Sequence, residues 1–173
     1  MKICYALLLG YLLAQPVLAQ TKPSTRKPLK PTPDLIGLIT VNPESVHGST
    51  TLTAFIDVIE TKKVPTSGVI TVYVLKISSF IDFTFDPKAT AVGENNVQNA
   101  SWSLDATTNP DYYIFTSTKT IAGGAVSTIG LTGTFTPSTA GKTGLTMSIS
   151  QGSGGEINHG NNVASTAITY WPK

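Results

Sequence analysis

From Asp34 onward, apolar and polar residues alternate over short stretches, and Gly, Pro, Asn or Asp residues separate one stretch from the next. A period of two places apolar side chains on one face of a strand and polar side chains on the other. Strands buried on both faces, as in parallel sheets, would show continuous apolar runs instead. The pattern therefore predicts an all-β protein of antiparallel sheets, each with one face in the core and one in solvent.

The turn residues divide this region into about nine strands, with the spacing typical of sandwiches. The expected strands cover residues 35–41, 50–60, 69–77, 80–85, 100–104, 112–118, 127–136, 143–151 and 163–171. In the second strand one face carries Leu52, Ala54, Ile56 and Val58, whereas Phe55 lies on the other face. We therefore expect an immunoglobulin-like antiparallel β-sandwich.

Residues 1–19 have the features of a secretory signal peptide, with a basic start, an apolar run and a small-residue cleavage pattern at residues 17–19. The run is short for a membrane span, although length alone leaves an uncleaved anchor as an alternative. Cleavage before Gln20 would remove Cys4, the one cysteine, so the mature chain would form no disulfide and offer no thiol nucleophile. This predicts a secreted or periplasmic protein with no membrane span after cleavage.

Residues 20–33 form a basic, proline-rich linker, whereas all 10 acidic residues of the chain lie from Asp34 onward. A proline-rich segment with few apolar residues buries too little surface to fold and favours extended conformations. It is either a spacer that touches an anionic surface or a solvated leader. The predicted division is a signal peptide at 1–19, the linker, and a β-sandwich domain at 34–173. Because the domain has more acidic than basic residues, no nucleic-acid partner is expected.

Two short motifs fall short of catalytic or cofactor-binding patterns. Ser153 lacks the preceding glycine of a nucleophile elbow, because Gln151 stands at that position. The Gly-Lys-Thr segment at 141–143 resembles the end of a phosphate loop, but Thr136 replaces the opening glycine. We therefore predict no catalytic residue and no cofactor.

Histidines and carboxylates are the other candidates for catalysis. His47 and His159 lie far apart in sequence, which favours two surface histidines over a triad or a zinc site. The carboxylates that could pair for glycoside hydrolysis are Asp57, Glu60, Asp82 and Asp86. An Asp-Pro turn at Asp86 and a solvent-facing position for Asp82 are the simpler interpretation. The prediction is a protein that is not an enzyme.

Aromatic rings are a second route to ligand binding. Tyr112, Tyr113 and Phe115 place rings on both faces of one strand, so one ring points away from the core. Such a ring could stack on a sugar, although packing at an inter-sheet corner is the commoner fate. In addition, the segment Asn-Ala-Ser at 99–101 fits the acceptor pattern for N-glycosylation.

The loop before the last strand concentrates polar side chains, namely Glu156, Asn158, His159, Asn161 and Asn162. Calcium prefers carboxylate, amide and backbone oxygens, so the glutamate and the three asparagines are candidate ligands. One carboxylate is few for a hard cation, and the loop glycines at 152, 154, 155 and 160 suit positive backbone angles. We therefore predict a turn that holds no required metal. Glu156 is expected at the surface, so Glu156→Gln should cost less stability than a β-branched residue at position 155.

Both ends of the domain resemble a known family. Pro33-Asp34-Leu35 opens the first strand, and a glycine-rich turn at 152–156 leads through Asn161-Asn162 into the last strand. This layout is similar to that of bacterial surface modules of the cell-adhesion-related and conserved-repeat type. The resemblance implies an immunoglobulin-like sandwich that works at a cell surface.

Two classes of function follow from these observations. The first is an exported, non-enzymatic binding or structural module of the bacterial cell envelope or surface, related to adhesion, with a protein or polysaccharide as its partner. The second is a small carbohydrate-active enzyme or carbohydrate-binding module that uses surface carboxylates and aromatics. Two carboxylates facing each other across a concave sheet would favour the enzyme. A flat or convex site with exposed rings would favour the binding module.

Overall fold

The computed structural model describes residues 30–77 and 81–173, so the predicted signal peptide and most of the linker lie outside the described residues. The strands are β1 (Leu35–Asn42), β2 (Ser45–His47), β3 (Thr50–Glu60), β4 (Ile70–Leu75), β5 (Ile81–Thr84), β6 (Ala91–Val92), β7 (Asn95–Asn96), β8 (Ser103–Asp105), β9 (Tyr112–Ser117), β10 (Val126–Phe135), β11 (Gly141–Ile149) and β12 (Val163–Trp171). Two short 3-10 turns are η1 (Asn99–Ser101) and η2 (Ser153–Gly155).

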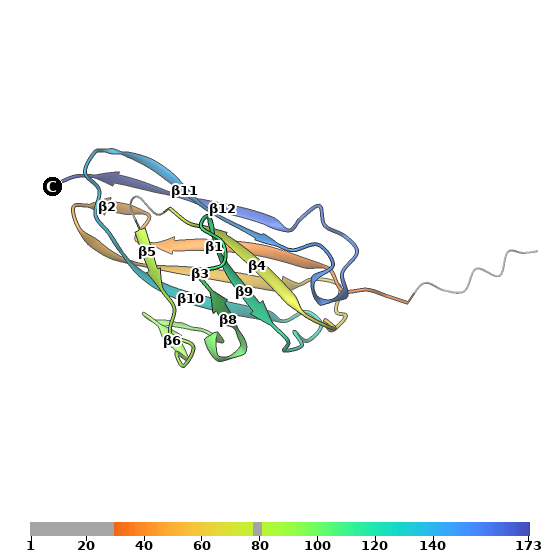
Figure 1. Cartoon of the computed structure of the whole chain (residues 1–173). Coiled ribbons are helices and arrows are strands. Elements are labelled where there is room, and N and C mark those ends of the chain that lie inside the picture. The colour runs from red at the N-terminus through yellow and green to blue at the C-terminus, as the bar shows by residue number, and fades with distance from the viewer. Residues whose placement is uncertain (1–29, 78–80) are drawn as a thin grey trace, which may run out of the picture. The chain divides into compact units, whose positions relative to one another are not determined.

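Two sheets pack face to face (Figure 1). A four-stranded sheet has the order β1-β3-β10-β5, and a six-stranded sheet has the order β2-β12-β11-β4-β9-β8. The pairs are antiparallel except for the short parallel pair of β2 with β12. A separate β6–β7 hairpin lies outside both sheets. The predicted all-β sandwich is confirmed.

The core lies between the inner faces of the two sheets. On β3, the side chains at 52, 54, 56 and 58 have 0% exposure, as the alternation predicts. They join one buried cluster with Leu145 and Met147 of β11 and Phe115 of β9. Burial of this many apolar side chains is the main stabilising term for a domain without cross-links.

Some local expectations were wrong. The strand expected at 100–104 begins at Ser103, because η1 occupies the preceding residues. Three short strands, β2, β6 and β7, were not expected. Phe55, on the outer face of β3, is only 8% exposed, because it packs with Val92 and Val97 of the hairpin segment. The outer face of the four-stranded sheet is therefore partly covered.

A glycine lets this hairpin approach the sheet. A Cβ atom on Gly130 of β10 would lie 2.6 Å from Cγ1 of Val97 and 2.8 Å from Cγ2 of Val92. Real Cβ atoms do not approach other atoms so closely, so any other residue at this position would displace the hairpin. The hairpin side chains therefore rest directly on the backbone of β10.

Beyond the end of β5, Asn99 and Gln98 take the place of a neighbouring strand and hydrogen-bond to the backbone N–H and C=O groups of β10. The Asn99 carboxamide donates from Nδ2 to the Gly130 carbonyl at 2.9 Å and accepts at Oδ1 from the Gly130 N–H at 2.8 Å. Gln98 pairs in the same way with Thr128, through its own N–H at 2.8 Å and its Oε1 at 2.6 Å. Because Asn99 is 0% exposed and its Nδ2 is engaged, the glycosylation pattern at this position is inaccessible in the folded protein.

In the described part of the chain, no helix has the length and apolar character needed to cross a membrane.

Candidate functional site

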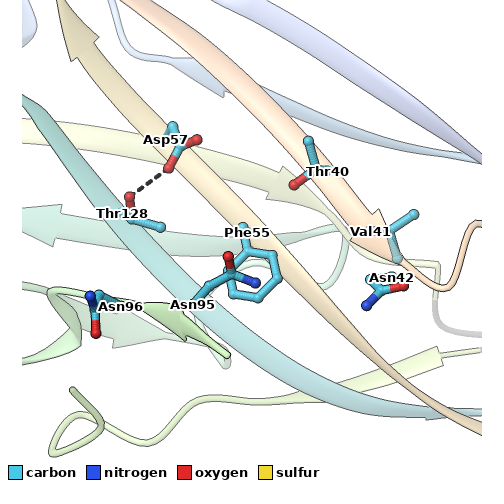
Figure 2. Close-up of a pocket in the computed structure, with 8 residues that line it drawn as sticks. All are labelled: Thr40, Val41, Asn42, Phe55, Asp57, Asn95, Asn96 and Thr128. Atoms are coloured by element: carbon cyan, nitrogen blue, oxygen red, sulfur yellow. Dashed lines mark hydrogen bonds between the residues drawn. The ribbon is translucent and has the colours of Figure 1, made fainter. Parts of the chain in front are cut away.

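A polar groove lies on the outer face of the four-stranded sheet, on the side that carries the β6–β7 hairpin (Figure 2). Its volume is about 360 Å³. The lining residues come from β1, β3, β10 and β7 and are Thr40, Val41, Asn42, Phe55, Asp57, Thr128, Asn95 and Asn96. Most of them carry hydroxyl, carboxamide or carboxylate groups. The groove is therefore suited to a ligand that is rich in hydrogen-bonding groups.

Strand pairing places the groove side chains in order. Thr40 of β1 lies opposite Phe55 of β3, and Thr128 of β10 lies opposite Asp57 of β3. All four face outward, because the alternate positions on these strands are in the core. β3 thus forms the floor of the groove, and β1 and the hairpin lie on its two sides.

Asp57 is the charged group of the groove, and a hydrogen bond holds its carboxylate in place. The Thr128 hydroxyl donates to Asp57 Oδ1 at 2.6 Å, the dashed line in Figure 2. A carboxylate has two acceptor oxygens, so Oδ2 can accept a hydrogen bond from a ligand. Holding the carboxylate in one orientation reduces the entropy that a ligand must overcome on binding.

The charge of the groove limits what it can bind. Among the described lining residues Asp57 is the only charged side chain, and Lys, Arg and His are absent. A half-buried carboxylate without a neighbouring cation repels anions such as phosphate, sulfate or uronate. Carboxamides and hydroxyls, by contrast, donate to and accept from uncharged polar groups. The lining therefore disfavours an anionic ligand.

In the candidate calcium loop, the position of the carboxylate differs from the one expected. Glu156 is only 3% exposed, so the expectation of a surface carboxylate was wrong. Its Oε2 accepts from the Leu35 N–H at 3.0 Å, and its Oε1 accepts from the Asn162 carboxamide. Burial raises the pKa of Glu156 above its ordinary value, and these hydrogen bonds offset only part of that effect. The carboxylate fastens the loop to the start of β1.

Two other asparagines of the loop donate hydrogen bonds to a second carboxylate, that of Asp34. Asn158 and Asn161 both donate from Nδ2 to Asp34 Oδ1, at 2.9 and 3.3 Å. Burial would raise the pKa of Asp34, but these bonds and one from Thr61 hold it below its ordinary value. Their carboxamide nitrogens therefore face the carboxylate, whereas an asparagine that binds calcium directs its carboxamide oxygen at the ion. The metal-free turn stays a prediction.

The loop glycines follow the expected turn chemistry except at one position. Gly152, Gly154 and Gly155 have φ values of 77°, 61° and 84°. Gly160, expected to be like them, does not have a positive φ. No group of three or more His, Cys, Asp or Glu residues suited to a metal occurs within residues 30–77 and 81–173.

The four carboxylates considered for glycoside hydrolysis do not meet in the groove. Asp86 begins the predicted turn, where its Oδ1 accepts from the Lys88 N–H at 2.8 Å. Asp82 is exposed on β5 and accepts from the Tyr113 hydroxyl at 3.1 Å. Glu60 is buried among backbone N–H groups. Of the four candidate carboxylates, Asp57 alone lines the groove.

Histidines and exposed rings lie elsewhere on the surface. His47 of β2 is exposed and stacks on Trp171 of β12 with ring centroids 4.5 Å apart, whereas His159 lies in the loop before β12. Tyr113 and Phe115 are buried, and Tyr112 is the ring that points outward, with 36% exposure. Tyr112 contacts Tyr73, with ring centroids 5.9 Å apart. Both tyrosines belong to the six-stranded sheet, whereas the groove lies on the four-stranded sheet.

Comparison with known proteins gives a fold but no family. No protein-family model matches the sequence, and no curated protein is significantly similar to it. A type I cohesin from Clostridium thermocellum, solved as a cohesin–dockerin complex, has a TM-score of 0.51 at 8% identity and covers 83% of this chain and 99% of that chain. At this identity the likeness establishes the β-sandwich fold alone.

Two further solved structures are similar. A cohesin module of a family 33 glycoside hydrolase from Clostridium perfringens has a TM-score of 0.49 at 10% identity, over 81% of this chain and 100% of that chain. The CARDB domain of a Pyrococcus furiosus protein, solved with di-metal ions, has a TM-score of 0.46 at 17% identity, over 82% of this chain and 96% of that chain. The similar structures thus include a domain of the cell-adhesion-related type that the sequence analysis named.

Sequence reasoning named Asp57 but missed the groove as a site. Its other residues are ordinary strand threonines and asparagines, and nothing in their spacing joins Asn95 to Thr40. The one signal available was the Asn95-Asn96 pair in a short polar stretch between turn residues.

Proposed function

We propose that this chain is an exported, non-enzymatic binding module of the cell exterior, and that its groove holds a neutral glycan. The observation that carries the proposal is the lining of the groove. Three carboxamides, two hydroxyls and one oriented carboxylate surround a floor that includes the Phe55 ring. Sugars offer many hydroxyl groups together with apolar C–H faces, so such a mixture matches them.

Binding is favoured over hydrolysis by the number of carboxylates. Glycosidases of the common type use two carboxyl groups on opposite sides of the scissile bond. Asp57 is the single carboxylate among the groove residues described here. The cohesin from Clostridium thermocellum, solved with its dockerin, uses a sandwich of this kind as a binding module, which supports a binding role. Export rests on the predicted signal peptide at 1–19.

Affinity electrophoresis tests the groove directly. The protein is run through gels that contain a neutral β-glucan, mannan or xylan, and through gels that contain anionic alginate or pectate. We expect a neutral polysaccharide to retard the wild-type protein. Asp57→Asn and Asn95→Ala should each weaken that retardation about two- to tenfold, the equivalent of one hydrogen bond.

Gln151→Ala provides the control, because it removes an exposed carboxamide in the turn before η2, away from the groove. Retardation that is equal for all four proteins would contradict a groove-based site. Retardation by the anionic polymers alone would contradict a neutral ligand.

A further inference from the structure

The groove opens at one end onto rows of threonine side chains. These threonine rows face outward on β3, β10 and β5 and consist of Thr53, Thr132 and Thr84 in the first row and Thr51 and Thr134 in the second. Thr132 lies opposite both Thr53 and Thr84, and Thr134 lies opposite Thr51. All except the half-buried Thr53 are exposed. The two adjacent rows together form one surface that carries hydroxyl groups.

The first row begins at the groove itself. Asn42, which lines the groove, lies directly opposite Thr53 in the pairing of β1 with β3. The Thr53 hydroxyl donates to the Asn42 carbonyl at 3.4 Å. Along β3 the outward-facing residues run from Asp57 through Phe55 and Thr53 to Thr51, a distance of about 20 Å at roughly 3.4 Å per residue. The groove and the rows therefore lie in one line along β3, which we call the polar track and in which the buried Phe55 ring is the apolar member.

The other end of the groove is apolar. Beyond Asp57 the next outward residue of β3 is Ile59, which lies opposite Ile36 of β1 and Val126 of β10. Val126 is 49% exposed, and Leu38, opposite Asp57, is 46% exposed. A hydroxyl-rich chain finds no hydrogen-bonding partners among these side chains. The polar track therefore leads away from the groove in one direction only.

We propose that the ligand is a linear neutral polysaccharide whose chain leaves the groove along β3 and lies across the threonine rows. This inference rests on the binding function proposed above and adds that the site recognises a chain, not a single sugar or a chain end. The rows carry no charged side chain up to Asp82, which lies opposite Thr134, so, like the groove, they offer uncharged hydrogen-bonding groups and no cation. A track of about 20 Å contacts several sugar units in succession.

Calorimetric titration with cello-, manno- and xylo-oligosaccharides graded in length tests this inference. We expect the wild-type affinity to rise with chain length. The double variant Thr84→Val and Thr132→Val changes a cross-strand pair of the first row. It keeps the β-branched shape that strands favour and removes two hydroxyls. It should weaken binding of long oligosaccharides about two- to tenfold and leave short ones unchanged. Asp57→Asn should weaken binding of both.

Thr71→Val with Thr116→Val is the matched control, since these residues are a cross-strand pair of β4 and β9 in the other sheet. The inference is overturned if affinity does not depend on length, or if the Thr84 and Thr132 variant binds long chains like the wild type. In that case weaker binding by Asp57→Asn would leave the groove as the site. If Asp57→Asn also had no effect, the proposed function would fail together with the inference.

Discussion

Buried carboxylates hold the point where the linker meets the sandwich. Glu60, at the end of β3, is 1% exposed and accepts four backbone hydrogen bonds. The donors are the N–H groups of Asp34 at 3.3 Å, Lys62 at 2.9 Å, Val64 at 3.2 Å and Gly124 at 2.7 Å. Burial would raise the pKa of Glu60, but together these donors hold it below its ordinary value of 4.5. One side chain thus joins three chain segments.

Glu60 and Glu156 should give stability opposite dependences on pH. The lowered pKa of Glu60 means that its contribution is present above 4.5 and is lost as pH falls through the folded-state pKa. The raised pKa of Glu156 means that folding is favoured when it is protonated, so stability falls as pH rises from 4.5 through the folded-state pKa. Urea unfolding across this pH range should show that Glu60→Gln reduces the loss of stability on the acid side, to which Asp34 still contributes. Glu156→Gln should remove the fall in stability that accompanies rising pH.

Glu60→Gln should also lower the free energy of unfolding at neutral pH by about 1–3 kcal/mol, because an amide group would face backbone donors. Glu94→Gln, at an exposed position between β6 and β7, should leave the pH profile of the wild type unchanged. A Glu156→Gln profile parallel to that of the wild type would contradict the assignment of the second effect.

Among the elements, β10 shows how a sheet can end without a neighbouring strand. β5 pairs with β10 only from Thr132 to Phe135. Over Thr128 and Gly130 the edge is completed by the Gln98 and Asn99 groups described above. An unpaired edge is a template for pairing with another chain, and proteins commonly cover such edges. η1 therefore acts as a cap for β10.

Asn99→Ala should expose this edge. The change leaves the buried N–H and C=O of Gly130 without partners, so we expect a loss of about 2 kcal/mol or more in the free energy of unfolding. We also expect concentration-dependent association, visible by size-exclusion chromatography. Ser103→Ala, at an exposed position of β8, is the control. A monomeric Asn99→Ala protein of wild-type stability would contradict the role of the cap.

Strands that contribute to the core could be predicted, because burial of one face imposes a period of two. The run from Leu52 to Val58 is the clearest case. Strands of two or three residues, such as β6, are too short to show any period. Trp102 suggested a strand because it is apolar, but its burial comes from packing at the end of η1, where its Nε1 donates to Ser127 Oγ at 3.0 Å.

The groove depends on pairing that the local sequence does not contain. Thr40 and Thr128 lie on either side of β3 only because β1 and β10 both pair with it. Register between strands so far apart is set by tertiary packing. Likewise Glu156 looked like a surface residue because its neighbours are polar, but it is buried by contact with β1.

For the whole molecule, the predicted signal peptide determines the expected compartment. The proposed export rests on residues 1–19, which lie outside the described residues. We expect mass spectrometry of the exported protein to give Gln20, in open or cyclised form, as the new N-terminus. The melting temperature of that mature protein should not change with added thiol, since Cys4 would have been removed. Retention of the apolar run in the exported protein would contradict the signal peptide.

The direction of β1 has a mechanical consequence. In Figure 1 the chain enters β1 at one end of the sandwich and leaves β12 at the opposite end. A force applied between Pro31 and Trp171 therefore acts along the strands. Such a force shears β1 against β3, so the hydrogen bonds over all eight paired positions of β1 carry the load together, with the Glu60 and Glu156 bonds at its start. A pull on the linker would therefore meet the resistance of the whole strand at once, a property that would suit the binding role proposed above.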